Sequence, residues 1–133
     1  SRPEGFSMGE RSMTSLEPAL VPAESVQVPW PDWTELEQRI ARTAFDQAHG
    51  RALASLISEV QLQAALLDSA GALWQLHDYL SIQRHRIEGR FDFRPQAILF
   101  LFASLVQDKL LDLAELEGLA SGKLAKIRAM AQF

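Results

Sequence analysis

An aromatic ring, two histidines, a carboxylate and several arginines are concentrated between residues 73 and 94 of this chain. On a helical period of about 3.6 residues, one face collects seven of these side chains at spacings of three or four: Trp74, His77, Asp78, Ser81, Arg84, His85 and Glu88. Tryptophan and arginine are enriched at protein–protein hot spots, whereas a helix face that only meets water usually carries Glu, Lys, Gln and Ala. The face therefore indicates a surface that binds another protein.

The two histidines of this face do not form a recognisable metal motif. His77 and His85 are eight residues apart, which is wider than the i, i+4 pair of helical zinc motifs, and no third ligand is evident. Ser81, His77 and Asp78 project outward from one helix and lack an oxyanion donor, so Ser-His-Asp chemistry is not expected. We predict no metal, no cofactor and no enzymatic activity. A metal-dependent enzyme centred on His77 and His85 is kept as an alternative, which metal analysis of the purified protein would test.

Four arginines, at positions 84, 86, 90 and 94, make a locally positive strip with acids only at Glu88 and Asp92. A helical regulator that binds DNA or RNA through these arginines is the alternative interpretation. Such binding needs more positive charge and a helix whose start is presented to a groove, but the net charge is −4 and the pI is near 5.3. An acidic protein surface is the more natural target, and we expect no nucleic-acid partner.

Length and composition narrow the class of protein. The chain has 133 residues and no cysteine, so it is one domain at most and has no disulfide or thiolate metal site. The longest apolar run, residues 97–106, is about half of the roughly 20 residues needed to cross a bilayer, and no signal-peptide pattern is evident. We predict a cytoplasmic protein without a transmembrane segment.

Proline content divides the chain into two parts. Five of the six prolines lie at positions 3 to 31, among Ser, Glu and Gly and without a helical or strand period, so residues 1–31 are predicted to be a disordered arm. From Asp32 onward apolar residues recur at helical spacing, and no alternation or hairpin turn indicates a strand. We predict an all-α fold in which residues 32–133 form a single helical domain, with a long N-terminal stalk helix and three shorter helices.

The first helix is predicted to follow a cap at Asp32 or Thr34 and to continue for about 30 residues to Leu67, with Gly50 as its only weak point. A helix of that length cannot bury its whole apolar stripe inside so small a monomer. A second copy of the chain would cover the stripe and Trp74 as well. We therefore expect a helical dimer. Its predicted interface residues are Leu56, Ile57, Val60 and Trp74.

Local signals predict the ends of the later helices. A cap at Asp68 or Ser69 and a left-handed Gly89 would bound the second helix, and Asp92 would cap the third with Pro95 in its first turn. The fourth helix would follow a D-x-x-E capping pattern, residues 112–115, and continue past the glycines at 118 and 122.

Apolar residues of these helices supply the expected core. On the second helix, the predicted core stripe is Leu73, Leu76, Leu80 and Ile87. The phenylalanines at 91, 93, 100 and 102 should be mostly interior, although four helices leave few interior places. One ring can remain outside. An exposed Phe100 next to Lys123 or Lys126 would make a second contact point for a partner.

The stretch Leu73-Trp74-Gln75-Leu76-His77-Asp78-Tyr79-Leu80, followed by Arg84-His85 and Glu88-Gly89-Arg90-Phe91-Asp92-x-Arg94, closely resembles the fluorescence recovery protein family of cyanobacteria. The likeness continues through Ile98-Leu99-Phe100-Leu101-Phe102-Ala103 and Lys126-Ile127-Arg128-Ala129-Met130-Ala131, and reaches back to Trp33. It covers the last hundred residues or so. Gln83 departs from it, because a basic residue is expected there.

The resemblance implies a dimeric, all-helical regulator of photoprotection. Such a protein binds the light-activated red form of the orange carotenoid protein, mainly through that protein's C-terminal domain, and accelerates its return to the orange form. It also helps release the carotenoid protein from the phycobilisome, which lies near the thylakoid surface. By the same resemblance, the expected functional patch near the dimer seam is Trp74, His77, Asp78 and Arg84. The expected partner contacts on the helical head are Phe100 and Lys126.

Overall fold

A computed structural model describes residues 30–132, and the regular elements within that range are all helices. In chain order they are α2 (Glu35–Ala65), α3 (Ala70–Arg90), α4 (Ile98–Gln107), the short 3-10 helix η3 (Leu113–Leu116) and α5 (Ser121–Ala131). The predicted all-α fold, with one long helix followed by shorter ones, is confirmed. The predicted arm of residues 1–31 falls almost entirely outside the described residues. That residues 32–133 form one domain stays a prediction.

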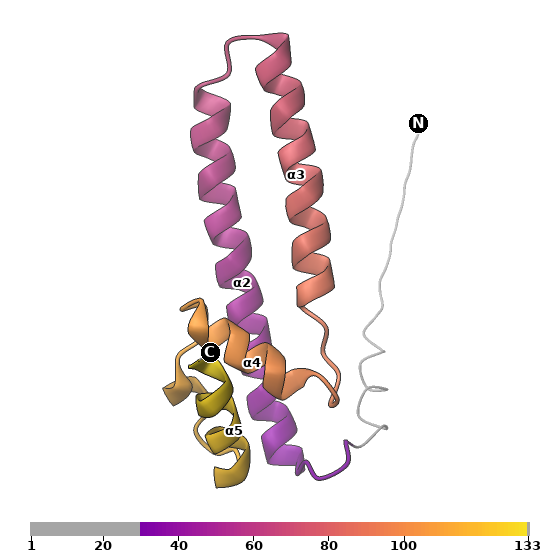
Figure 1. Ribbon diagram of the computed structural model, residues 1–133, viewed down its shortest axis with the longest axis vertical. Coiled ribbons are helices and arrows are strands. Elements are labelled where there is room, and N and C mark those ends of the chain that lie inside the picture. Colours follow the sequence, from indigo (N-terminus) through magenta and orange to yellow (C-terminus); the bar gives the residue numbers. More distant parts are fainter. Residues whose placement is uncertain (1–29, 133) are drawn as a thin grey trace, which may run out of the picture. The chain divides into compact units, whose positions relative to one another are not determined.

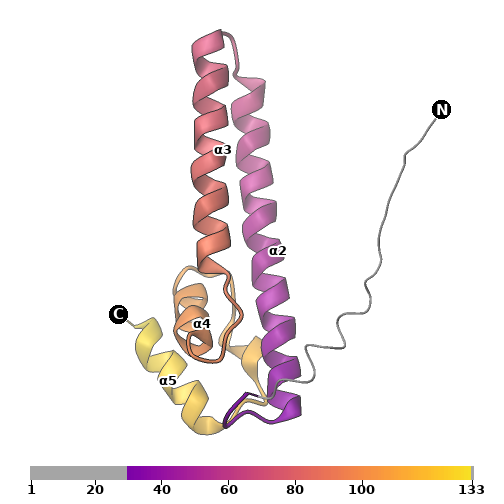
Figure 2. The ribbon, with the colours of Figure 1, turned by 90° about the vertical axis from the view of Figure 1, so that its right-hand side faces the viewer.

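Helices α2 and α3 lie side by side and antiparallel, and we call this helical hairpin the stalk (Figures 1 and 2). Helices α4, η3 and α5 gather beside the N-terminal half of α2, and we call them the head (Figure 1). The stalk therefore has two regions. Its lower part carries the head, and its upper part consists of α2 and α3 alone.

Helix α2 begins with a complete capping box. The Thr34 hydroxyl accepts from the N–H of Glu37, and the Glu37 carboxylate accepts from the N–H of Thr34, both at 3.0 Å. Thr34 is therefore the cap, and Asp32, with φ of 65°, is not. Gly50 does not interrupt the helix, which ends at Ala65 as predicted to within two residues. The next cap is Ser69, whose hydroxyl accepts from the N–H of Ala72 at 3.1 Å.

Two boundaries of the middle helices differ from the prediction. Gly89 does not end α3, which continues to Arg90, and Gly89 has no positive φ; the C-cap is Phe91, whose N–H donates to the Ile87 carbonyl. Asp92 does not cap α4. Its carboxylate pairs with the Arg94 side chain at 2.7 Å, so it is not available to a helix N-terminus. Pro95 lies in the turn that follows, and α4 begins only at Ile98.

The predicted fourth helix is divided in two. The D-x-x-E pattern does form a capping box, with the Glu115 carboxylate accepting from the N–H of Asp112 at 2.9 Å, but it caps the single turn η3. Gly118 then adopts φ of +110°, which side-chain-bearing residues rarely do. A Cβ at Gly118 would also clash with the end of the Ile40 side chain. The chain therefore turns at Gly118, and α5 starts at Ser121.

Small residues on α2 let the head pack closely against the stalk. Ala41, Ala44 and Ala48 recur at helical spacing and are essentially fully buried. The largest fully buried side chains of the head are Ile98, Phe102, Leu105, Leu116 and Ile127. This core lies at the base of the stalk, because only there do α2 and the head together enclose an interior.

The predicted core stripe of α3 is largely outside this core. Leu76 is buried, but Leu73 and Leu80 are 45% and 38% exposed and Ile87 is half-buried. The prediction was wrong for Leu73 and Leu80 within a single chain. Two helices side by side can shield only the strip between them, so side chains beside that strip stay in contact with water.

Candidate functional site

The predicted binding face of α3 is open to solvent. Trp74 is 62% exposed, an unusual position for so large an aromatic ring. His77 and Asp78 are also exposed, and their side chains meet at 3.3 Å between Nδ1 and Oδ1. The structure thus keeps the three side chains on one helix face without enclosing them. They lie on an open helix surface.

Arg84 extends the same face toward the base of α3. Its Nε donates to the Glu88 carboxylate at 3.0 Å, one helical turn further along, and both side chains are largely exposed. An exposed i, i+4 pair of this kind contributes only about 0.3–0.5 kcal/mol. The guanidinium can therefore exchange Glu88 for a carboxylate of another protein at little cost. We call Trp74, His77, Asp78 and Arg84 the stalk patch.

The head carries a second exposed group. Phe100 on α4 is 70% exposed, whereas Phe102 two residues later is fully buried. Phe91 and Phe93 instead pack edge to face against Phe45, at 5.6 and 5.0 Å between ring centroids. Phe100 is thus the ring that remains outside, as the sequence allowed.

The two lysines proposed to lie near Phe100 differ in their surroundings. Lys123 forms an ion pair with Glu37 at 3.0 Å and its side chain is largely buried, so it is committed to the fold. Lys126 is exposed on α5, the helix against which α4 packs. We call Phe100 and Lys126 the head patch.

Sequence reasoning missed the polar links that hold the head on the stalk. Glu37 is only 5% exposed, and its carboxylate accepts from the Ala120 N–H at 2.7 Å and from Lys123 at 3.0 Å. The N–H groups of Thr34 and Ala120, together with Lys123, lower the pKa of Glu37 to about 2 against the opposing effect of burial. One carboxylate therefore joins the start of α2 to the start of α5.

A second link joins the middle of α2 to η3. Arg51 binds Glu115 through two nitrogens, at 2.8 and 2.6 Å, and also donates to the Leu110 carbonyl at 3.0 Å. Arg51, followed by the N–H of Asp112, lowers the pKa of Glu115 to about 2. The capping patterns at Thr34 and Asp112 were visible in the sequence, but the partners Lys123 and Arg51 were not, since they lie 86 and 64 residues away from these glutamates.

The arginine strip does not exist as one positive surface. Arg84 pairs with Glu88, Arg90 with Asp108 at 2.6 Å, and Arg94 with Asp92. Within residues 30–132, Arg86 alone of the four has no hydrogen bond or ion pair. Three of the four charges face carboxylates, which lowers the net positive charge that the strip would present to a nucleic-acid backbone.

The predicted dimer residues lie on an uncovered part of the stalk. Ile57 is 56% exposed, and Leu56 and Val60 are half-buried. Other large apolar side chains share the upper stalk in exposed positions: Leu53, Leu62, Leu66, Leu73, Trp74, Leu80 and Ile82. A collection of this size is typical of a protein–protein interface.

Across the residues that the structure describes, no group of three or more His, Cys, Asp or Glu side chains is arranged to hold a metal ion. None of the helices in that range combines the length and apolarity of a membrane span.

Comparison with known proteins identifies the family. Residues 33–131 match the family model described as photoprotection regulator fluorescence recovery protein. The fluorescence recovery protein of Synechocystis sp. is 40% identical over 100 residues, which are 75% of this chain and 92% of that protein.

Solved structures agree with the sequence match. The fluorescence recovery protein of Fremyella diplosiphon superposes with a TM-score of 0.73 at 36% identity, covering 77% of this chain and all of that one. The Synechocystis sp. protein gives a TM-score of 0.72 at 40% identity, over 76% of this chain and 99% of its own. With its stalk, its head and its exposed aromatic and cationic groups, the chain belongs to the fluorescence recovery protein family of photoprotection regulators.

Proposed function

We propose that this chain binds the photoactivated red form of the orange carotenoid protein, accelerates its return to the orange form and promotes its detachment from the phycobilisome. Family membership supports the proposal, and the observation that carries it is the exposed indole of Trp74 beside an exchangeable guanidinium on α3. The chain acts as a non-enzymatic regulator, in the cytoplasm close to the thylakoid surface where phycobilisomes are attached.

The proposed mechanism is selective binding. A protein that accelerates a conformational return without breaking bonds must bind the crossing state, in which two separated domains come back together, more tightly than the starting state. A preference of about 1.4 kcal/mol gives a tenfold increase in rate. A single buried Trp or Phe contact is large enough to supply it.

Discrimination between the two forms requires surfaces that are available only while the carotenoid protein is open. In our proposal, the stalk patch binds its C-terminal domain through the Trp74 ring and the Arg84 charge, while His77 and Asp78 keep the geometry around them. The head patch adds Phe100 and Lys126 as a second contact. The closed orange form binds weakly because its domains cover the surfaces that these patches need.

The proposed active species is a homodimer whose interface includes Leu56, Ile57, Val60 and Trp74. The exposed apolar side chains of the upper stalk support it, because a second hairpin laid against the first would remove them from water. Such packing would build a bundle of four helices from two hairpins.

Co-elution with the carotenoid protein tests the proposal directly. The purified chain is mixed with the carotenoid protein in darkness or under continuous blue-green light and separated by gel filtration under the same illumination. We expect a complex in the light and little in the dark. Equal co-elution in both conditions would remove the selectivity on which the mechanism depends, and no complex in either would reject the partner.

A further inference from the structure

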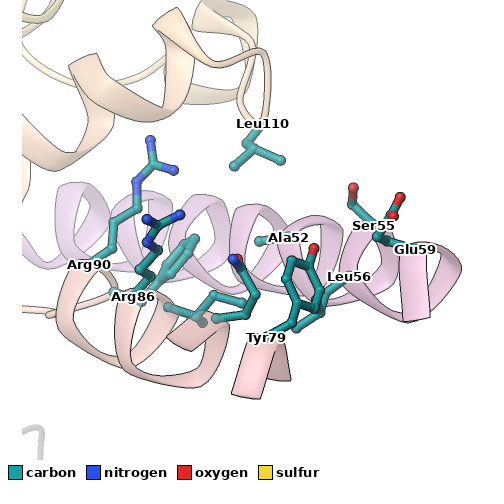
Figure 3. A pocket seen from close by; sticks show the side chains of 11 residues that line it. Ala52, Ser55, Leu56, Glu59, Tyr79, Arg86, Arg90 and Leu110 are labelled. Carbon is teal, nitrogen blue, oxygen red and sulfur yellow. The ribbon is translucent and has the colours of Figure 1, made fainter. Parts of the chain in front are cut away.

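A groove runs between the two helices of the stalk where they meet the head. It has a volume of about 480 Å³ and is lined from α2, from α3 and from the loop after α4 (Figure 3). Its α2 residues are Ala52, Ser55, Leu56 and Glu59. Its α3 residues are Tyr79, Gln83, Arg86, Ile87 and Arg90, followed by Phe91 at the helix end and Leu110 from the loop. A space of this size lies within the range of small-molecule sites.

One end of the groove is positively charged. Arg86 and Arg90 lie there together (Figure 3). Arg86 makes no hydrogen bond or ion pair within residues 30–132, and Arg90 uses a single nitrogen, Nη2, for both Asp108 and Ser104. Several N–H donors of two guanidinium groups are therefore available. Planar donors of this kind match a carboxylate or a similar oxyanion.

The rest of the groove is apolar with a few polar groups. Leu56, Ile87, Phe91 and Leu110 supply the apolar lining, and the Tyr79 hydroxyl lies between the two ends (Figure 3). Glu59 lies at the end of the groove opposite the arginines. It is seven residues, or about two helical turns, after Ala52 on α2, which corresponds to a rise of about 10 Å. This arrangement favours a ligand with one negative end and an apolar body, and disfavours one with a second negative charge.

The groove is separate from the stalk patch, although it shares Leu56 with the proposed dimer interface. Arg84 and Arg86 are two residues apart, which places them about 200° apart around α3, on opposite sides of the helix. The stalk patch and the groove can therefore be occupied independently. Ile57, next to Leu56 in the chain, likewise points about 100° away from it.

We propose that this groove binds a small amphipathic monoanion, with its carboxylate on Arg86 and Arg90 and its apolar body along Leu56, Ile87 and Phe91. Because the groove is lined from α2, α3 and the Leu110 loop, a bound molecule bridges the stalk to the head. Binding of the monoanion does not require the carotenoid protein, so this site is tested separately from the proposed function.

Octanoate is a suitable probe, and octylammonium, with the same tail and opposite charge, is its matched control. Each is titrated into the full ¹⁵N-labelled chain while backbone amide shifts are followed by NMR. We expect saturable octanoate shifts around Tyr79, Arg86 and Leu110, with a Kd of about 1 mM or below. Octylammonium should bind at least about tenfold more weakly, since it meets two guanidinium groups.

Two variants locate the anion end. Arg86→Gln should weaken octanoate binding about tenfold or more, and Arg84→Gln, which removes the same charge from the other side of the same helix, should leave it within about twofold. Both arginines are exposed, so both variants should keep the helical circular dichroism of the parent. The site would be overturned if both variants lost binding equally or if octylammonium bound more tightly than octanoate. It would also be overturned if the shifts were confined to the side of Trp74 and Ile57, or if no saturable shift appeared up to about 10 mM.

Discussion

At the scale of residues, exposure separates side chains that hold the fold from those free to bind. Phe102 is fully buried and Phe100 is 70% exposed, although both belong to one apolar run. Lys123 is paired with Glu37, whereas Lys126 is exposed. The sequence allowed one phenylalanine to remain outside and left open which lysine lies near Phe100. The packing of the head and the Glu37 carboxylate of α2 decide which member of each pair faces water.

The stalk patch makes a residue-scale prediction. Trp74→Ala and Arg84→Leu should each slow the recovery of the orange form by at least about tenfold, because an anchor aromatic or arginine at a hot spot contributes roughly 2 kcal/mol or more and about 1.4 kcal/mol already corresponds to a factor of ten. Recovery is followed by absorbance in the dark after illumination of a mixture with carotenoid protein. Since both side chains are exposed, circular dichroism should stay helical.

Arg39→Leu is the control for that experiment, because Arg39 is an exposed arginine on α2 away from the patch. It should recover at the parental rate. If both Trp74→Ala and Arg84→Leu also recover at that rate, the stalk patch is not the binding surface. A loss in all three variants would point to a general effect of surface change.

At the scale of elements, local capping signals predicted the starts of α2, α3 and η3 but not those of α4 and α5. The capping boxes at Thr34 and Asp112 involve residues three apart, so the pattern is complete in the sequence. Gly89 was predicted to end a helix and Gly118 to lie within one, yet it is Gly118 that takes a positive φ. Gly118 also lies against the end of the Ile40 side chain on α2. No local pattern contains that long-range contact.

The site was predictable to a similar degree. The shared face of Trp74, His77, Asp78 and Arg84 follows from helical spacing alone, and α3 does present all four to solvent. The pairs of Arg84 with Glu88 and of Arg94 with Asp92 are local, but the pair of Arg90 with Asp108, at the end of α4, joins residues 18 apart and was not predictable. Tertiary contacts decide whether neighbouring charges in the sequence form one surface.

The Glu37 link makes an element-scale prediction. Its pKa is lowered to about 2 from an ordinary 4.5, so it binds fewer protons in the folded than in the unfolded chain. Its contribution to stability is therefore complete above about pH 4.5 and is lost as the pH falls toward 2. Glu37→Gln should lower the free energy of unfolding at pH 7 by roughly 2–3 kcal/mol, because it removes the negative charge that Lys123 and the N–H groups of Thr34 and Ala120 face.

Urea unfolding at pH 7 and pH 3 measures both effects. The difference in stability between parent and Glu37→Gln should be large at pH 7 and smaller at pH 3. Glu35→Gln, an exposed glutamate in the same helical turn, is the matched control and should change stability by less than about 0.5 kcal/mol. A Glu37→Gln variant as stable as the parent at pH 7 would show that the link does not hold the head.

At the scale of the whole molecule, the two halves of the stalk differ in how much of their apolar surface a single chain can bury. The lower half packs its alanines against the head, whereas the upper half leaves Leu53, Ile57 and Leu62 in water. Exposed apolar side chains on a helix this long favour association. The proposed dimer accounts for them, and it places the seam beside the stalk patch, since Trp74 belongs to both sets.

Ile57→Glu tests the seam. In a single chain Ile57 is 56% exposed, so the carboxylate should be tolerated in the folded monomer. In the proposed dimer the same carboxylate would be buried without a partner, at a cost of several kcal/mol per copy. Light scattering at micromolar concentration should therefore report a helical monomer. Ser58→Glu adds the same charge at the next, exposed position and should remain dimeric. A dimer that persists in Ile57→Glu would move the seam to another face of the stalk.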